Sequence, residues 1–194
     1  ADHIVRNQTR FQEVVVEAAE LASRGAIVTF GITPQYPETG YGYIERGEQG
    51  EVVTFKEKPD RATAEHYLES GRFFWNSGMF AFTAESFRAE MEEHAPAIVA
   101  AMAKAVAEGE RDGCFYRLNR QQMERCPSDS IDYALMEKTA KAAVVAADLG
   151  WSDIGSWQAL WQVVDKDHDG NVCQGDVYLQ DTRKCLSLKE DMLV

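Results

Sequence analysis

Glu57 and Lys58 stand side by side in the 194-residue sequence, just before Pro59 at the expected end of a strand. A carboxylate that accepts hydrogen bonds from hydroxyls, beside an ammonium that pairs with phosphate, would suit a sugar phosphate. Adjacent strand residues point to opposite faces, so both can serve one site only where the chain bends. Pro59 ends the strand and is expected to hold Lys58 extended. In isolation, a solvated strand end is the more common explanation of such a pair.

Asn76, followed by Ser77 and Gly78, interrupts an aromatic-rich stretch that predicts a strand. A polar step with a glycine inside such a strand marks either a β-bulge or a place where a ligand approaches the backbone. Taken alone, the pattern favours a structural bulge in which Asn76 caps local amides.

Asp153 is an acidic residue between Trp151 and Trp157, after one expected strand and at the start of an expected helix. In open α/β sheets, ligands gather at the carboxyl ends of strands. Asp153 could bind magnesium there, or it could cap the following helix through its side-chain oxygen. Asp2 is the natural partner carboxylate if it lies at the end of a neighbouring strand, which spacing alone leaves open.

A rival metal pattern runs from Asp165 to Gly170, where alternate aspartates followed by glycine match a calcium loop. Asp176 stands where a glutamate normally closes such a loop, and the residues after it are typical of a strand rather than of a second helix. A solvated Asp/Gly turn is therefore the favoured interpretation.

Hydrophobic periodicity predicts helices and strands that alternate along the chain, which is typical of an α/β fold. Glycines and prolines give the expected boundaries. The predicted helices cover residues 9–24, 60–70, 84–93, 96–108, 130–139 and 155–164, and the predicted strands cover residues 26–32, 41–46, 51–58, 73–82 and 142–147, with further β structure from 172.

Composition excludes several classes of protein. The formal charge of −12, with no basic run, makes nucleic acid a poor partner. No apolar stretch approaches the roughly 20 residues of a membrane helix, and no charged-then-apolar leader is present, so we expect a cytoplasmic protein without a membrane partner. The four cysteines form no C-x-x-C pair, and neither a zinc site nor a redox pair is expected.

Five ordered segments together resemble the mannose-1-phosphate guanylyltransferases, in particular the bacterial type often fused to a mannose-6-phosphate isomerase. The segments are PETGYGYI (37–44), FKEKP (55–59), WNSGMF (75–80), SIDYALMEK (130–138) and WSDIGSW (151–157). The resemblance implies a Rossmann-like mixed-sheet nucleotidyltransferase fold that forms GDP-mannose and pyrophosphate from GTP and mannose 1-phosphate.

The resemblance also implies site residues. Asp2 and Asp153 would hold Mg²⁺ or Mn²⁺. The residues expected on the sugar side are Glu57 and Asn76 for hydroxyls, Gly42 through its backbone, Lys58 for the sugar phosphate, and, more weakly assigned, Asp132. Asp2, Lys58 and Asp153 would form the catalytic set.

Family members begin with a glycine-rich segment, containing an Arg and a Lys, that this sequence lacks. We therefore expect a fold incomplete at the N-terminus, with residues 1–165 as the central and sugar-binding part and 166–194 as the start of a β-rich C-terminal region. The 194 residues alone are expected to be nearly inactive. Alternatives are a transferase for another hexose 1-phosphate and a non-catalytic sugar-nucleotide-binding regulatory module. Homo-oligomer formation is left open.

Overall fold

The structure is a computed structural model that describes residues 3–188, and its chain divides into two compact units. The first unit comprises residues 1–7 and 150–194, and the second comprises residues 8–149. The domain boundary suggested by the sequence, between residues 165 and 166, falls inside the first unit and stays a prediction.

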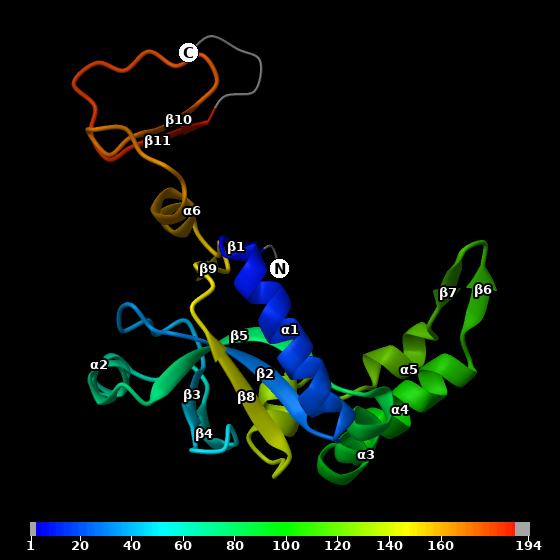
Figure 1. Ribbon diagram of the computed structural model, residues 1–194. Coiled ribbons are helices and arrows are strands. Elements are labelled where there is room, and N and C mark those ends of the chain that lie inside the picture. The colour runs from blue at the N-terminus through cyan, green and yellow to red at the C-terminus, as the bar shows by residue number, and fades with distance from the viewer. Residues whose placement is uncertain (1–2, 189–194) are drawn as a thin grey trace. The chain divides into compact units, whose positions relative to one another are not determined.

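A five-stranded mixed sheet forms the centre of the second unit (Figure 1). β2 and β8 are parallel, whereas the other neighbouring strands are antiparallel. Every residue of β2 is buried, as its apolar run predicts for a strand covered on both faces. In spatial order the strands are β4 (Val52–Lys56), β3 (Tyr43–Arg46), β5 (Phe73–Ala81), β2 (Ile27–Ile32) and β8 (Ala142–Ala147).

Helices cover this sheet. α1 (Gln8–Ser23) lies along β2 and β8 and buries Val14, Ala18 and Ala22 (Figure 1). α2 (Arg61–Ser70) begins after its N-cap Asp60 and ends at Gly71. α3 (Ala84–His94) is followed by α4 (Pro96–Ala107). The core cluster that joins α3 to the sheet and to the segment after residue 130 contains Ile27, Met91, Leu135, Met136 and Ala142.

The helix predicted over residues 130–139 is instead the short π-helix η1 (Asp132–Met136). Its defining hydrogen bond runs from Glu137 N to Asp132 O at 3.0 Å, five residues back along the chain. Ala134, Leu135 and Met136 are all buried. Hydrophobic periodicity correctly predicts a helix here, but it cannot distinguish a π-helix from an α-helix. The choice between the two depends on tertiary packing.

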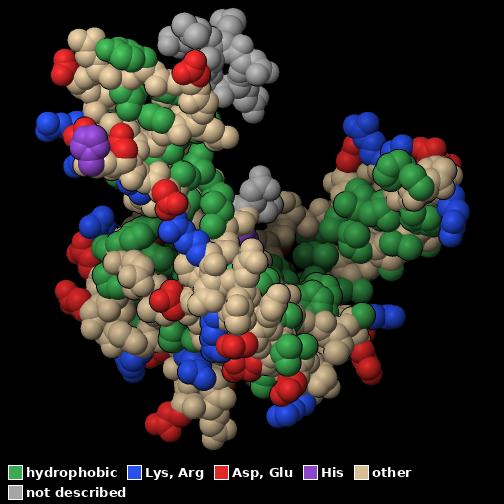
Figure 2. Space-filling view, turned by 45° about the horizontal axis from the view of Figure 1, so that its top comes forward, with side chains coloured by type: hydrophobic (Ala, Val, Ile, Leu, Met, Phe, Trp, Pro, Cys, Tyr) green, Lys and Arg blue, Asp and Glu red, His purple; other side chains and the backbone are tan. Residues whose placement is uncertain are grey.

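A hairpin that the sequence analysis did not predict extends from the second unit together with α4 and α5 (Arg120–Glu124) (Figure 1). Its strands are β6 (Glu110–Asp112) and β7 (Phe115–Arg117). All residues of both strands are exposed, and Phe115 is 65% exposed. Hydrophobic side chains accordingly gather on this surface (Figure 2).

The described part of the first unit, residues 3–7 and 150–188, contains two small strand pairs and one helix. β1 (Ile4–Val5) pairs antiparallel with β9 (Trp151–Ser152), with Ile4 opposite Ser152. α6 (Trp157–Val163) follows its N-cap Ser156. β10 (Val172–Gln174) and β11 (Leu186–Leu188) form a parallel pair. Within residues 3–188, no helix has the length and apolar character needed to cross a membrane.

Candidate functional site

Asn76 is the centre of a buried polar cluster in the second unit. Its amide nitrogen Nδ2 donates a hydrogen bond to Asp132 Oδ1 at 3.0 Å. Its oxygen Oδ1 accepts from Thr29 Oγ1 at 2.9 Å and from the backbone N–H of Gly78 at 3.2 Å. The cluster therefore joins strands β2 and β5 to the π-helix η1, three elements that are distant in sequence.

The predicted irregularity at Asn76 is confirmed. The pairing of β2 with β5 shifts register between Thr29 and Gly31, and Gly31 stands opposite Asn76. Gly31 has no room for a side chain, because an added Cβ would lie 2.8 Å from Val144 Cγ2 and 2.9 Å from Phe74 Cβ. The register shift places Asn76 at an irregular position of β5, from which its side-chain amide reaches Asp132.

The side chains of Glu57 and Lys58 lie at the same site because the chain bends after β4. The extended conformation expected for Lys58 was wrong. β4 ends at Lys56, and Lys58 has a φ of +44°, in the left-handed region rather than extended. Before a proline the right-handed helical region is disfavoured by a clash with the ring, and the chain turns here through the left-handed region, which is uncommon for a residue other than glycine. The turn brings Lys58 Nζ to 3.4 Å from Glu57 Oε1.

Gly42 lies between Glu57 and Asn76. An added Cβ at Gly42 would be 2.6 Å from Glu57 Oε2 and 3.3 Å from Asn76 Cβ. The carbonyl oxygen of Gly42 also accepts the backbone N–H of Asn76 at 2.7 Å. The structure thus brings together the residues that the resemblance assigned to the sugar side, and any larger residue at Gly42 would collide with the Glu57 carboxylate.

Two carboxyl groups in this cluster, those of Asp132 and Glu57, have a raised pKa, which means that their surroundings disfavour the ionised form. Burial raises the pKa of Asp132, and the hydrogen bond from Asn76 and the charge of Lys58 offset only part of the increase. Burial also raises the pKa of Glu57, to which the negative charge of Asp132 adds, while Lys58 opposes both. The Glu57 side chain is 12% exposed, whereas that of Lys58 is 63% exposed. The site therefore offers half-buried acceptors for hydroxyls beside an accessible cation for a phosphate.

Thr29 is the member of the cluster that sequence reasoning missed. It is fully buried within the apolar run of β2. A buried hydroxyl needs a partner, so a threonine between Val28 and Phe30 was itself a signal that another polar group lies nearby.

The predicted metal residues belong to the first unit. Asp153 directly follows β9, and its Oδ1 accepts the backbone N–H of Gly155 at 3.2 Å. Ser156, not Asp153, caps α6 by accepting from Ala159 N, so the helix-cap alternative for Asp153 was wrong. Asp2 lies outside the described residues, although strand β1 of the same terminal segment is the direct neighbour of β9.

The donor chemistry at Asp153 fits magnesium. Across residues 3–188 there is no group of three or more His, Cys, Asp or Glu side chains that could hold a metal. Magnesium does not need such a group, because it commonly binds one or two carboxylates together with substrate phosphates and waters. The single carboxylate that the structure describes here is compatible with that mode of binding.

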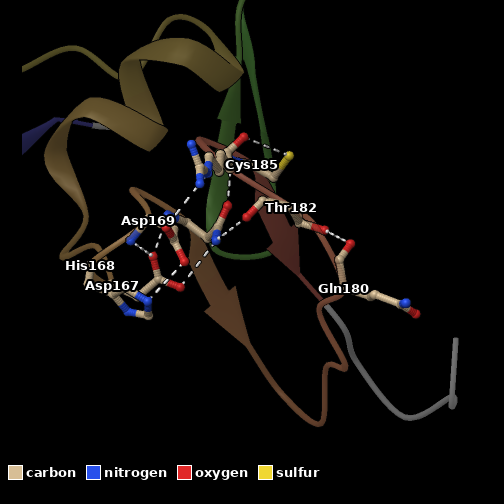
Figure 3. A network of polar contacts seen from close by, with 8 residues as sticks. Asp167, His168, Asp169, Gln180, Thr182 and Cys185 are labelled. Carbon is tan, nitrogen blue, oxygen red and sulfur yellow. Dashed lines mark hydrogen bonds and ion pairs between the residues drawn. The ribbon is translucent and has the colours of Figure 1, made fainter.

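The calcium-loop pattern forms a hydrogen-bonded turn (Figure 3). Asp167 accepts from the backbone N–H groups of Asp169 and Asn171 at 3.0 and 2.7 Å, and from Asn171 Nδ2 at 3.2 Å. The hydrogen bond from the Asn171 backbone, above all, lowers the pKa of Asp167. The carboxylate is therefore satisfied by protein N–H groups, and the first regular element after Asp176 is the strand β11 rather than a second helix, which favours the structural turn. The residues directly after Asp176 (177–179), expected to be a strand, lie outside regular structure.

Comparison with known proteins identifies the class. Residues 1–170 match the family model described as nucleotidyl transferase, so the chain belongs to the nucleotidyl transferase family. Along its whole length it is 49% identical to a putative mannose-1-phosphate guanylyltransferase of Vibrio cholerae and 44% identical to the mannose-1-phosphate guanylyltransferase of Klebsiella pneumoniae. The chain spans 43% of the length of each. The resemblance found in the sequence is thereby confirmed.

Solved structures agree with this class. A Thermus thermophilus protein described as mannose-1-phosphate geranyltransferase aligns with all of this chain and 62% of its own, at a TM-score of 0.80 and 29% identity. Mannose-6-phosphate isomerase from Helicobacter pylori aligns with 78% of this chain and 62% of its own, at a TM-score of 0.74 and 35% identity. The predicted mixed-sheet nucleotidyltransferase fold is confirmed.

Proposed function

We propose that this chain provides the sugar-phosphate side of a mannose-1-phosphate guanylyltransferase, which forms GDP-mannose and pyrophosphate from GTP and mannose 1-phosphate. The observation that carries the proposal is the convergence of Gly42, Glu57, Asn76 and Asp132 on one place in the second unit. The names of the relatives, which are similar to the chain along its whole length, support the choice of reaction.

Each group has a distinct part in holding the sugar. The carboxylates of Glu57 and Asp132 accept hydrogen bonds from hydroxyls, which relieves the charge that they share. Asn76 Nδ2 has two hydrogens, and the one not directed at Asp132 is available as a donor. The exposed Lys58 ammonium, held at the bend after β4, pairs with the phosphate.

The reaction joins two phosphates. An oxygen of the sugar phosphate attacks the α-phosphorus of GTP in line, a new P–O bond forms, and the bond to the departing pyrophosphate breaks. Such a transfer depends on positioning and charge neutralisation rather than on a covalent nucleophile. Lys58 orients the attacking phosphate, and the hydroxyl contacts orient the sugar. Asp2 and Asp153 are proposed to hold Mg²⁺ or Mn²⁺, which when bound would neutralise phosphate charge.

Calorimetric titration of the chain with mannose 1-phosphate tests the sugar side. We expect Lys58→Met to weaken binding at least tenfold, because it removes the cation that pairs with phosphate. Lys56→Met, two positions earlier and also exposed, is the matched control and should bind like the wild type. Equal losses in both variants, or no binding by the wild type, would contradict the proposal.

The same titration separates the alternatives. Tighter binding of glucose 1-phosphate than of mannose 1-phosphate would favour a transferase for another hexose. Binding without any GDP-mannose formation by the natural full-length protein would favour a regulatory module. Cytoplasmic location and homo-oligomer formation stay predictions from the sequence.

A further inference from the structure

We infer that Thr29 is a positioning residue for sugar recognition, holding the Asn76 amide so that Asn76 and Asp132 together present one donor and one acceptor to a single sugar hydroxyl. The inference rests on the proposed function. It adds to that function an account of how the site recognises one particular hydroxyl of the sugar. Neither the family match nor the relatives' names assign Thr29 a part.

The orientation of the Asn76 amide follows from its neighbours. An ionised carboxylate can only accept hydrogen bonds, so the 3.0 Å contact with Asp132 Oδ1 requires the amide nitrogen on that side. A backbone N–H can only donate, so the 3.2 Å contact from Gly78 requires the amide oxygen on the other side. Together these two groups exclude the flipped amide.

Thr29 then adds the shortest hydrogen bond to the amide. With the oxygen facing it, the Thr29 hydroxyl donates to Asn76 Oδ1 at 2.9 Å, and the alternative acceptor, Met79 O, is farther away at 3.3 Å. Thr29 is 0% exposed in a central strand of the sheet. The contact from Gly78, in contrast, comes from the same bulge as Asn76 and moves with it. Thr29 is therefore the anchor that ties Asn76 to the sheet.

The consequence is a paired donor and acceptor. Asn76 Nδ2 retains one hydrogen beyond that given to Asp132. The Asp132 carboxylate, which also has a hydrogen bond with the Ser130 side chain, keeps further lone pairs that can accept. A hydroxyl both donates and accepts, so it satisfies this pair, whereas a hydrogen atom in its place leaves the second amide hydrogen of Asn76 and one acceptor site of Asp132 without that partner. A buried polar group without a partner is costly, so the site discriminates against the deoxy sugar.

A panel of mannose 1-phosphate and its monodeoxy analogues tests the inference in calorimetric titrations of the chain. For the wild type, one analogue should bind distinctly more weakly than the others. In Thr29→Val, which keeps the shape and removes the hydroxyl, we expect mannose 1-phosphate to bind about three- to tenfold more weakly. The affinity ratio between mannose 1-phosphate and that one analogue should shrink by the same factor. Thr29→Ser should restore both, which loss of packing alone would not explain.

A measurement without ligand separates this inference from the proposed function. The Asn76 side-chain NH₂ signals in a ¹⁵N-correlated NMR spectrum should change in Thr29→Val and return in Thr29→Ser. If both the NH₂ signals and the analogue ratio are the same in Thr29→Val as in the wild type, the inference is overturned. If the wild type binds no sugar phosphate, the proposed function fails. If, in addition, the Asn76 NH₂ signals are the same in Thr29→Val as in the wild type, the proposed role of Thr29 in holding the Asn76 amide is also overturned.

Discussion

Two carboxylates in the second unit, the buried Glu90 and the half-buried Asp132, have opposite environments. Glu90 on α3 is 3% exposed and lies 2.6 Å from Lys141 Nζ, with Thr139 Oγ1 and His94 Nε2 as further partners. Burial raises the pKa of Glu90, but the hydrogen bonds and charges of Lys141, Thr139 and His94 outweigh burial and set the pKa below its ordinary value. Lys141 correspondingly has a raised pKa, above all through its hydrogen bond to Glu90.

Asp132 and Glu57 show the reverse balance. Both have a raised pKa, each carboxyl is poorly solvated, and the negative charge of Asp132 disfavours ionisation of Glu57. A carboxylate that stabilises a fold is neutralised by its neighbours, as Glu90 is. A carboxyl group whose pKa is raised by burial and by a second acidic group nearby is instead typical of a ligand site. The contrast predicts that changes at Glu90 act on stability, and changes around Asp132 act on binding.

The largest expected effect is on the stability of Lys141→Met at neutral pH. Removing the cation leaves the buried Glu90 carboxylate without its main partner, which lowers stability. Lys141 is itself 56% exposed, so solvent screening makes the loss smaller than for a fully buried pair, but it should exceed the effect of changing an unpaired surface lysine. Urea unfolding measures the change, and Lys138→Met, at an exposed lysine nearby, is the control.

The pH dependence of that loss is a further check. The lowered pKa of Glu90 contributes stability that is present above the pKa of the unfolded chain and is lost as the pH falls through the folded pKa. In Lys141→Met, protonation of Glu90 removes the unpaired charge, so the deficit should narrow in acid. A deficit no larger than that of Lys138→Met at neutral pH would refute the structural role of Glu90.

The second effect is a loss of binding at Gly42. In Gly42→Ala the new Cβ would lie 2.6 Å from Glu57 Oε2, so the flexible carboxylate must move away. We expect mannose 1-phosphate to bind at least tenfold more weakly, about 1.4 kcal/mol, with little change in unfolding free energy. Calorimetry and urea unfolding provide the two measurements.

Gly71→Ala is the matched control for Gly42→Ala. Gly71 has a φ of +67° and no atom within 4 Å of an added Cβ, so alanine there meets backbone strain but no neighbour. It should lower stability by about 1 kcal/mol and leave binding unchanged. Wild-type affinity in Gly42→Ala would show that Glu57 takes no part in the site.

The smallest expected effect is on the stability of Asp132→Asn. Because the folded pKa of Asp132 is raised, the charged group costs stability above that pKa, and the cost disappears as the pH falls through it towards the unfolded value. We expect Asp132→Asn to gain about 0.5–1 kcal/mol at pH 8 and to lose this advantage in acid. Urea unfolding at both pH values tests this, with the exposed Asp129→Asn as control. If Asp132→Asn is instead less stable than the wild type at pH 8, Asp132 has a stabilising role like that of Glu90 and is not part of a ligand site.

Local signals in the sequence were sufficient for most elements. The apolar run of residues 26–32 predicted a strand covered on both faces, and β2 is buried throughout. The glycine in the aromatic strand predicted the irregularity opposite Gly31. The exposed β6–β7 hairpin was not predicted, because its side chains are mixed charged and aromatic and have no alternation towards a core.

The order and residue types of the motifs determined the family and most of the sugar side, because strand ends, bulges and glycine positions follow from local backbone sterics and hydrophobic pattern. The tertiary structure alone decided the π-turn that presents Asp132 and the hydrogen bonds of Asn76 with Thr29 and Asp132. These hydrogen bonds join residues 47 and 56 positions apart in the chain. Their hydrogen bonds and shared burial exist only once the sheet and the π-helix have packed, so no local pattern could determine them.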